Sequence, residues 1–164
     1  MSDAKNYLAF DFGASSGRAI LGKLNNGRLE LEEIHRFSND PVEINGHYYW
    51  DTFRLFYEIK QGLIKYAQGD YGVLDGIGID AWGVDFGLIG PSGELLGVPY
   101  HYRDARTQGM MEEADKLMGR RKIFDESGIS HEFFNTINQL LAMVKQNSPA
   151  LKYADHLLFI PDLF

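Results

Sequence analysis

The sequence predicts an α/β fold, with a mixed β-sheet and flanking helices in the order βββαβα. Three runs with strand-like apolar or alternating patterns come first, at residues 7–10, 18–24 and 28–37. A helix-like run at residues 52–68 then precedes another short apolar run at residues 73–80. A strand that follows a helix is usually reached by a crossover, so we expect it to pair parallel in the sheet.

Length, charge and amino-acid composition indicate a globular domain and argue against several classes of protein. The chain has 164 residues, of which 45% are hydrophobic, so it can build one domain with a real core. Its net charge of −7 argues against a nucleic-acid surface, which needs a basic patch. It has no cysteine, and its five histidines lack metal-ligand spacing, which argues against disulfides, a thiol nucleophile and a zinc site. No signal peptide or membrane-length apolar run is visible, so we expect a cytoplasmic protein.

Turn residues support the strand assignment. An Asn-Gly step at residues 26–27 lies between two alternating runs and predicts a hairpin, so three antiparallel strands open the domain. A second Asn-Gly step lies in residues 38–49, which also contain a proline, and predicts a loop or short hairpin there.

The first strand ends in an acid and a turn of small residues, Asp-Phe-Gly-Ala-Ser-Ser-Gly-Arg at residues 11–18. The two glycines allow positive φ and remove a Cβ atom, and the two serines add hydroxyls beside backbone N–H groups, so a phosphate could bind here. Arg18 can add positive charge. A plain hairpin turn with Asp11 as a turn acid is the alternative. The combination of groups favours a phosphate site, although neither a Walker loop nor a dinucleotide fingerprint is present.

A second polar turn follows the apolar run at 73–80. Asp80 and Asp85 lie on either side of Trp82 and Gly83. An indole face, bare backbone and carboxylates together suit a polyhydroxylated ligand. The alternative is that Trp82 belongs to the core and the two acids only stabilise turns.

Residues 101–107, His-Tyr-Arg-Asp-Ala-Arg-Thr, form a third polar cluster ahead of a helix. Either Arg103 or Arg106 could anchor an anion or pair with Asp104. The alternative is an ion pair that only fastens the start of the helix.

Helix signals complete the chain. Asp51 or Thr52 is expected to cap the helix at residues 52–68, and Gly69 to end it. Its expected core face is Phe53, Phe56, Ile59, Leu63 and Ala67. Further helices are expected at residues 107–118, at 120–126 before Gly128, and at 138–146, the last with Leu140, Leu141, Met143 and Val144 inward. A strand is expected at 156–160, and Asp162 resembles the cap of a helix that the sequence does not contain.

The Asp-x-Gly-x-x-x-x-Arg pattern at residues 11–18 resembles the first phosphate loop of the actin, Hsp70 and sugar kinase ATPases. Further matching motifs run along the chain: Ile-His-Arg-Phe at 34–37, Gly-His-Tyr-Tyr-Trp-Asp at 46–51, Gly-Ile-Asp-Ala-Trp-Gly-Val-Asp-Phe at 78–86, Tyr-Arg-Asp-Ala-Arg-Thr at 102–107, Phe-Asn-Thr at 134–136 and Pro-Asp at 161–162. Together they resemble the FGGY carbohydrate kinases, and within them the rhamnulokinase branch. Glycerol kinases of this family have an Arg-Glu pair where this sequence has Gly83 and Val84.

The resemblance implies a ribonuclease-H-like domain that uses ATP and Mg²⁺ to phosphorylate O1 of L-rhamnulose. It implies that Asp11, Gly13, Ala14, Ser15, Ser16, Gly17 and Arg18 hold the ATP phosphates, with Asp11 facing Mg²⁺. It also implies that Gly83 lies against the sugar, and that Trp82, Asp85, Arg103 and Asp104 line or support the pocket. Both ATP and the sugar are small-molecule partners; neither nucleic acid nor membrane is implied.

The resemblance also limits what this chain can do. The family's Asp base lies in a downstream motif that these residues lack, so no catalytic residue is assigned here. Residues 1–164 are therefore expected to be an incomplete N-terminal kinase domain that is nearly inactive alone. Two alternatives stay open: a kinase for another ketose or sugar-derived molecule, such as a xylulokinase, and a non-catalytic binding module of the actin clan.

Overall fold

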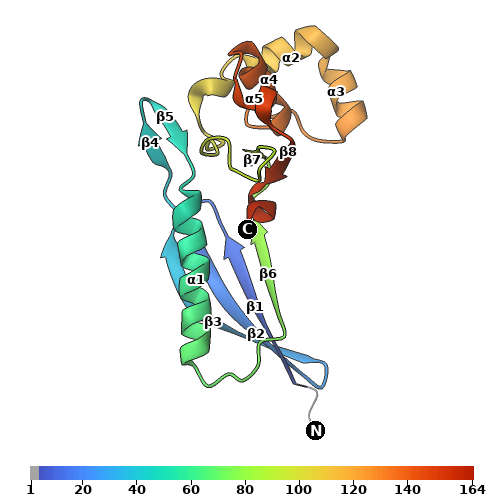
Figure 1. The fold of residues 1–164 in the computed structure, drawn as a ribbon. Helices are drawn as coiled ribbons and strands as arrows, with labels where there is room; N and C mark the ends of the chain where they lie inside the picture. Colours follow the sequence, from blue (N-terminus) through green and yellow to red (C-terminus); the bar gives the residue numbers. More distant parts are fainter. Residues whose placement is uncertain (1–3) are drawn as a thin grey trace.

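The computed structural model describes residues 4–164. Its main element is a four-stranded mixed sheet in the order β3-β2-β1-β6, with helix α1 (Thr52–Gln68) on one face (Figure 1). The strands are β1 (Lys5–Phe12), β2 (Ser16–Asn25), β3 (Arg28–Ser38) and β6 (Gly76–Ala81). β1 pairs antiparallel with β2 and parallel with β6, which confirms the predicted α/β class and the crossover.

Both Asn-Gly steps form the predicted turns. Asn26 and Gly27 have φ of 50° and 77°, and they join β2 to β3. Asn45 and Gly46 have φ of 53° and 79°, and they join β4 (Val42–Ile44) to β5 (His47–Tyr49). Two successive positive φ values are typical of the hairpin turn whose twist matches that of the strands.

The parallel pair in the sheet sets the positions of two loops. Asp11 lies opposite Asp80, and Phe12 lies opposite Ala81, so β1 and β6 end side by side. Neighbouring strands lie about 5 Å apart. The loop after β1 and the loop after β6 therefore leave the sheet at adjacent points of one edge.

Helix α1 packs on the sheet through a face different from the predicted one. Leu55, Ile59 and Tyr66 are buried against strand residues, whereas Phe53 and Phe56 are 77% and 52% exposed. Of the predicted face, Ile59 is buried and Leu63 is half-buried, while Ala67 is exposed. The reason is Gly62: a Cβ atom there would lie 2.6 Å from the Phe10 ring, so the helix approaches the sheet along the line through this glycine.

The second part of the molecule is mostly helical. It contains α2 (Met110–Met118), α3 (Arg120–Ser127), α4 (Thr136–Lys145) and α5 (Ala150–Tyr153), beside the strand pair β7 (Phe86–Ile89) and β8 (His156–Phe159) (Figure 1). Two short 3₁₀ helices, η1 (Ala105–Thr107) and η2 (Ile160–Leu163), complete it. None of the helices in residues 4–164 combines the length and apolarity that crossing a membrane requires.

Three expectations for this part need correction. Asp162 lies inside η2 instead of at the cap position before a helix. The helix expected from residue 107 begins at Met110, after η1. On α4, Met143 is buried as predicted and Leu140 and Leu141 are half-buried, but Val144 is 60% exposed. Asn138 and Gln139 are buried instead: Asn138 Nδ2 donates to the Glu132 carbonyl and Gln139 Nε2 donates to Asp85 Oδ1, while Asn138 Oδ1 has no partner in the described structure.

Substituting Gly62 tests the close approach of α1 to the sheet. Gly62→Ala should lower the free energy of unfolding by about 1–2 kcal/mol, because the new methyl group overpacks Phe10 and this outweighs the better helix propensity of alanine. Gly78→Ala is the control, since a Cβ atom at Gly78 meets no atom within 4 Å. Chemical denaturation of the full-length protein measures both, and equal stability of the two variants would contradict this packing.

Candidate functional site

The loop after β1 is held in a tight shape by its own backbone and by one side chain. The N–H of Gly13 donates to the carbonyl of Ser16 at 2.9 Å. Asn39 fastens the loop twice: its Nδ2 donates to the carbonyl of Gly13 at 2.8 Å, and its N–H donates to the carbonyl of Ser15 at 3.0 Å. Asn39 is buried. Sequence reasoning missed it; the only signal was the polar Ser-Asn-Asp run after the third strand.

The tip of this loop offers unused donors. Within the described chain, no hydrogen bond uses the N–H groups of Ala14 and Ser15, and Ser15 is exposed. Adjacent free N–H groups in a loop suit an anion. The glycines act differently from expectation, since neither Gly13 nor Gly17 has positive φ. Gly17 is needed for space, because a Cβ atom there would lie 2.1 Å from the Phe37 ring.

Charged groups flank this loop at the sheet edge. Asp11 faces Arg18 across the β1–β2 pair, with 3.6 Å between Oδ2 and Nη2, and both side chains are partly exposed, so their pairing is weak. Asp80 lies beside Asp11 in the parallel register. Residues 4–164 contain no group of three or more His, Cys, Asp or Glu that could hold a metal ion. One or two carboxylates fit Mg²⁺ bound together with phosphates, which is how proteins commonly hold this ion.

Asp85, in the loop after β6, is fully buried and organises its surroundings. Its Oδ2 accepts hydrogen bonds from Trp50 Nε1 at 2.6 Å, Trp82 Nε1 at 2.9 Å and the N–H of Tyr102 at 3.1 Å. Its Oδ1 accepts from Gln139 Nε2 at 2.8 Å. Burial raises the pKa of Asp85, and these four donors oppose the rise. All four donors are protein groups, so the role of Asp85 is to hold Trp82, Trp50, Tyr102 and Gln139 in place.

Trp82 and Gly83 are more exposed than Asp85, which lies buried in the same loop. Trp82 is half-buried and packs on fully buried Trp50, with ring centroids 4.0 Å apart, so it has both a core side and a partly exposed side. Gly83 is exposed, and a Cβ atom there would meet no atom within 4 Å. The protein therefore leaves open space where a side chain at position 83 would lie.

A cavity of about 560 Å³ opens beside Gly83. Its walls are mainly apolar side chains from the helical part and β8: Met118, Ile123, Ile129, Ile137 and Phe159. Thr136 and Val84 also line it. This volume is within the range of small-molecule sites, about 300–1,000 Å³.

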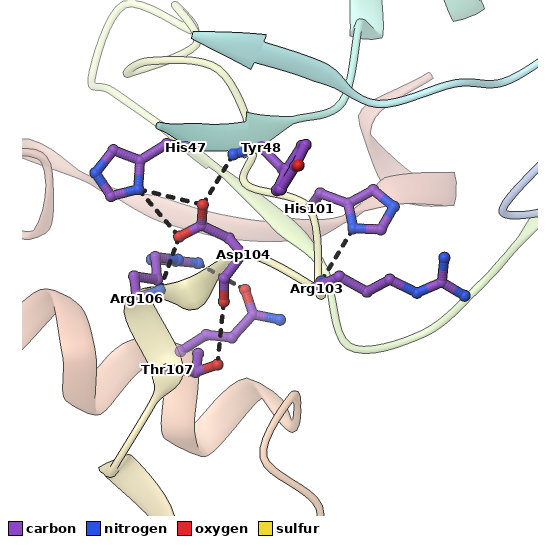
Figure 2. A network of polar contacts seen from close by, with 8 residues as sticks. His47, Tyr48, His101, Arg103, Asp104, Arg106 and Thr107 are labelled. Carbon is purple, nitrogen blue, oxygen red and sulfur yellow. Dashed lines mark hydrogen bonds and ion pairs between the residues drawn. The ribbon is translucent and has the colours of Figure 1, made fainter. Parts of the chain in front are cut away.

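Asp104 is buried and accepts the hydrogen bonds that hold residues 101–107, the third polar cluster, in place (Figure 2). It accepts from the N–H groups of Tyr48 at 2.8 Å and Arg106 at 3.0 Å, and it lies 3.2 Å from His47 Nδ1. Neither arginine guanidinium pairs with it in the described structure. Figure 2 shows the exposed Arg103 side chain pointing away from Asp104. Its guanidinium lies 5.2 Å from the centre of the Tyr102 ring and makes no hydrogen bond in the described structure.

Arg106 is buried, and its guanidinium contacts other side chains inside the protein. Its Nη2 donates to Gln139 Oε1 at 2.6 Å, and its guanidinium lies 4.0 Å from the centre of the Tyr100 ring. Burial lowers the pKa of Arg106. Of the two arginines considered for anion binding, only Arg103 is therefore accessible.

The comparisons with known proteins agree with this architecture. The chain is 43% identical to rhamnulokinase from Bacteroides thetaiotaomicron over 158 residues, and 44% identical to rhamnulokinase from Klebsiella pneumoniae over 162 residues. These alignments cover 96% and 98% of this chain but 32% and 33% of the relatives, so the chain spans about a third of their length. No protein-family model matches it. The chain is homologous to this part of the rhamnulokinases, which confirms the resemblance noted in the sequence.

Solved structures confirm the fold. Gluconate kinase from Lactobacillus acidophilus matches with a TM-score of 0.81 at 16% identity, over 96% of this chain and 32% of that one. Xylulose kinase from Rhodospirillum rubrum matches with a TM-score of 0.80 at 14% identity, over 97% and 33%. The chain thus has the actin-like ATPase fold of sugar kinases, as its sequence predicts.

Asn39→Ala tests how the first loop is held. Removing the amide deletes the bond to the Gly13 carbonyl and should lower the free energy of unfolding by about 1 kcal/mol. Hydrogen exchange of the Gly13 amide, which donates to the Ser16 carbonyl, should become faster, because the loop opens more often. Asp40→Ala, at the exposed neighbouring position, should leave exchange there unchanged. Unchanged exchange in Asn39→Ala would show that Asn39 does not fasten the loop.

His101 gives a pH test. Burial and the nearby Arg103 charge lower the pKa of His101 to about 4, and its Nδ1 accepts from the N–H of Arg103. The unfolded chain binds this proton near pH 6.5, so stability from neutral His101 is present above that pH and is lost as the pH falls towards 4. The loss of thermal stability between pH 7 and pH 5 should be smaller in His101→Phe. An identical loss in both proteins would contradict the low pKa.

Proposed function

We propose that this chain forms the first phosphate loop and part of the sugar pocket of an ATP-dependent kinase that phosphorylates L-rhamnulose at O1. The observation that carries the proposal is the register of β1 with β6, which brings the loop at residues 13–17 and the loop at residues 82–85 to one edge of the sheet. Ligands of such sheets bind outside the carboxyl ends of the parallel strands. The name of the homologous relatives, rhamnulokinase, supports the choice of sugar.

On the nucleotide side, the free N–H groups of Ala14 and Ser15, the hydroxyls of Ser15 and Ser16, and Arg18 would bind the ATP phosphates. Gly13 and Gly17 would allow the close backbone packing that this loop needs. Asp11 would face Mg²⁺, with Asp80 as the neighbouring carboxylate. Mg²⁺ would neutralise charge on the phosphates, and the chain's own residues would hold them in place.

On the sugar side, Gly83 would lie against the substrate, because the space in front of its Cα is empty. The partly exposed face of Trp82 would cover C–H groups, and the exposed Arg103 would reach hydroxyl oxygens. Asp85 and Asp104 are buried, so their part is to support Trp82, Tyr102 and the segment after them.

The remaining parts of the active site belong to residues outside this chain. We infer that residues 4–164 are part of a larger kinase domain, because the relatives are about three times as long and Ile77 of β6 is 53% exposed. We propose, on the resemblance seen in the sequence, that the aspartate base lies downstream of these residues. The use of ATP fits a cytoplasmic location. The homology does not favour the alternative sugar kinases or a non-catalytic module.

A sugar panel tests the proposed substrate. The full-length protein with ATP and Mg²⁺ should phosphorylate L-rhamnulose with a kcat/KM at least about 10-fold above those for D-xylulose and glycerol, a ratio that pocket contacts of 1–3 kcal/mol can give. A coupled assay for ADP release measures each sugar. Equal or higher kcat/KM for another sugar would refute the assignment.

Two variants separate the nucleotide side from the sugar side. Asp11→Ala should lower kcat by about 100-fold or more, because charge on the phosphates is no longer stabilised in the transition state. Gly83→Arg should fold normally and raise the sugar KM by about 10-fold or more while leaving the ATP KM unchanged, because the arginine fills the space kept open at Gly83. If neither variant changes its parameter, the site is assigned wrongly.

A further inference from the structure

The turn that carries Gly83 is strained at its next residue. The N–H of Asp85 donates to the carbonyl of Gly83 at 2.9 Å, and Val84 between them has φ of 69°. This is a three-residue turn with a left-handed centre, a rare and strained geometry. The other non-glycine residues with positive φ in the described chain are all asparagines, which tolerate it. Valine does not, because its branched Cβ crowds the backbone there.

Two side chains of α4 hold this turn. Thr136 Oγ1 donates to the carbonyl of Val84 at 2.9 Å, and Gln139 Nε2 lies 3.2 Å from the same oxygen. Their spacing of three residues puts both on one face of the helix. Backbone strain persists only where the surroundings enforce it, and it is concentrated at functional sites.

The orientation of Gln139 is itself fixed. Its Oε1 accepts from Arg106 Nη2 at 2.6 Å, and arginine can only donate, so Nε2 must point towards Val84 and Asp85. Gln139 is 1% exposed, and an unpartnered amide would be costly there. Nε2 has two hydrogens for three acceptors: Asp85 Oδ1 at 2.8 Å, the Phe134 carbonyl at 3.0 Å and the Val84 carbonyl at 3.2 Å. The Val84 carbonyl is the most distant of the three, so Thr136 supplies its main side-chain hydrogen bond.

The strained turn leaves the N–H groups of Gly83 and Val84 without a partner in the described structure. We propose that Thr136 is a positioning residue, with Gln139 in support: by holding the Val84 carbonyl, Thr136 fixes the direction of the peptide groups that Gly83 presents to the sugar. Neither residue needs to touch the sugar. This inference rests on the proposed function for the identity of the ligand, but the grip on Val84 can be measured without it.

The test compares Thr136→Val, which keeps the shape and removes the donor, with Thr136→Ser, which keeps the donor. In the full-length protein, Thr136→Val should raise the KM for L-rhamnulose about 10-fold and leave the KM for ATP within about twofold, the size expected for lost positioning of one contact group. Thr136→Ser should stay within about twofold for both. Exchange of the Asp85 amide, which donates to the Gly83 carbonyl, should become faster in Thr136→Val, while exchange in β1 and β2 stays slow.

The outcomes that would contradict the positioning role, the hold on Val84 and the proposed function can be told apart. If Thr136→Val loosens residues 83–85 but the sugar KM is unchanged, or if the KM values for sugar and ATP rise together, the positioning role is wrong. If exchange of the Asp85 amide is unchanged, Thr136 does not hold the turn and the inference also fails. If the unsubstituted protein phosphorylates no sugar, the proposed function fails, and the exchange result still decides whether the grip on Val84 exists.

Discussion

The structure depends on the parallel pairing of β1 with β6. Their register places Asp11 beside Asp80 and Phe12 beside Ala81, so two loops that are about 70 residues apart in sequence leave the sheet at one edge. Helix α1 makes this pairing possible, because it carries the chain back along the sheet and covers the core (Figure 1). A shift of this register by one residue would turn Asp80 to the opposite face and separate the carboxylates.

A second constraint joins the sheet to the helical part. Asp85 accepts hydrogen bonds from Trp50, Trp82, Tyr102 and Gln139, which come from four separate segments of the chain. A buried carboxylate without a cation partner is stable only when its oxygens are well satisfied. The sequence suggested that Asp85 binds a ligand. In the structure, its hydrogen bonds instead hold the turn at Trp82 and Gly83 against the rest of the protein.

The sequence predicted β1, β2, β3, β6 and β8, the turns at the two Asn-Gly steps and the crossover, because each has a local signal, but it did not predict β7. It could not show which side of α1 faces the sheet, since this depends on how closely Gly62 approaches Phe10. It also could not separate exposed Arg103 from buried Arg106, because their difference comes from Gln139, which reaches Arg106 from a distant helix. Asn39 and Gln139 were missed for the same reason: their partners are remote in sequence.

Hydrogen-exchange mapping of the full-length protein tests the central claim most directly, because it locates both ligands on the chain. With Mg²⁺ and ADP, exchange should slow at the amides of Ala14 and Ser15; with L-rhamnulose, it should slow at residues 82–85. Protection at both loops would support one shared edge for nucleotide and sugar. If these ligands instead protect the far end of the sheet, at residues 25–28, or leave both loops unprotected, the account is contradicted.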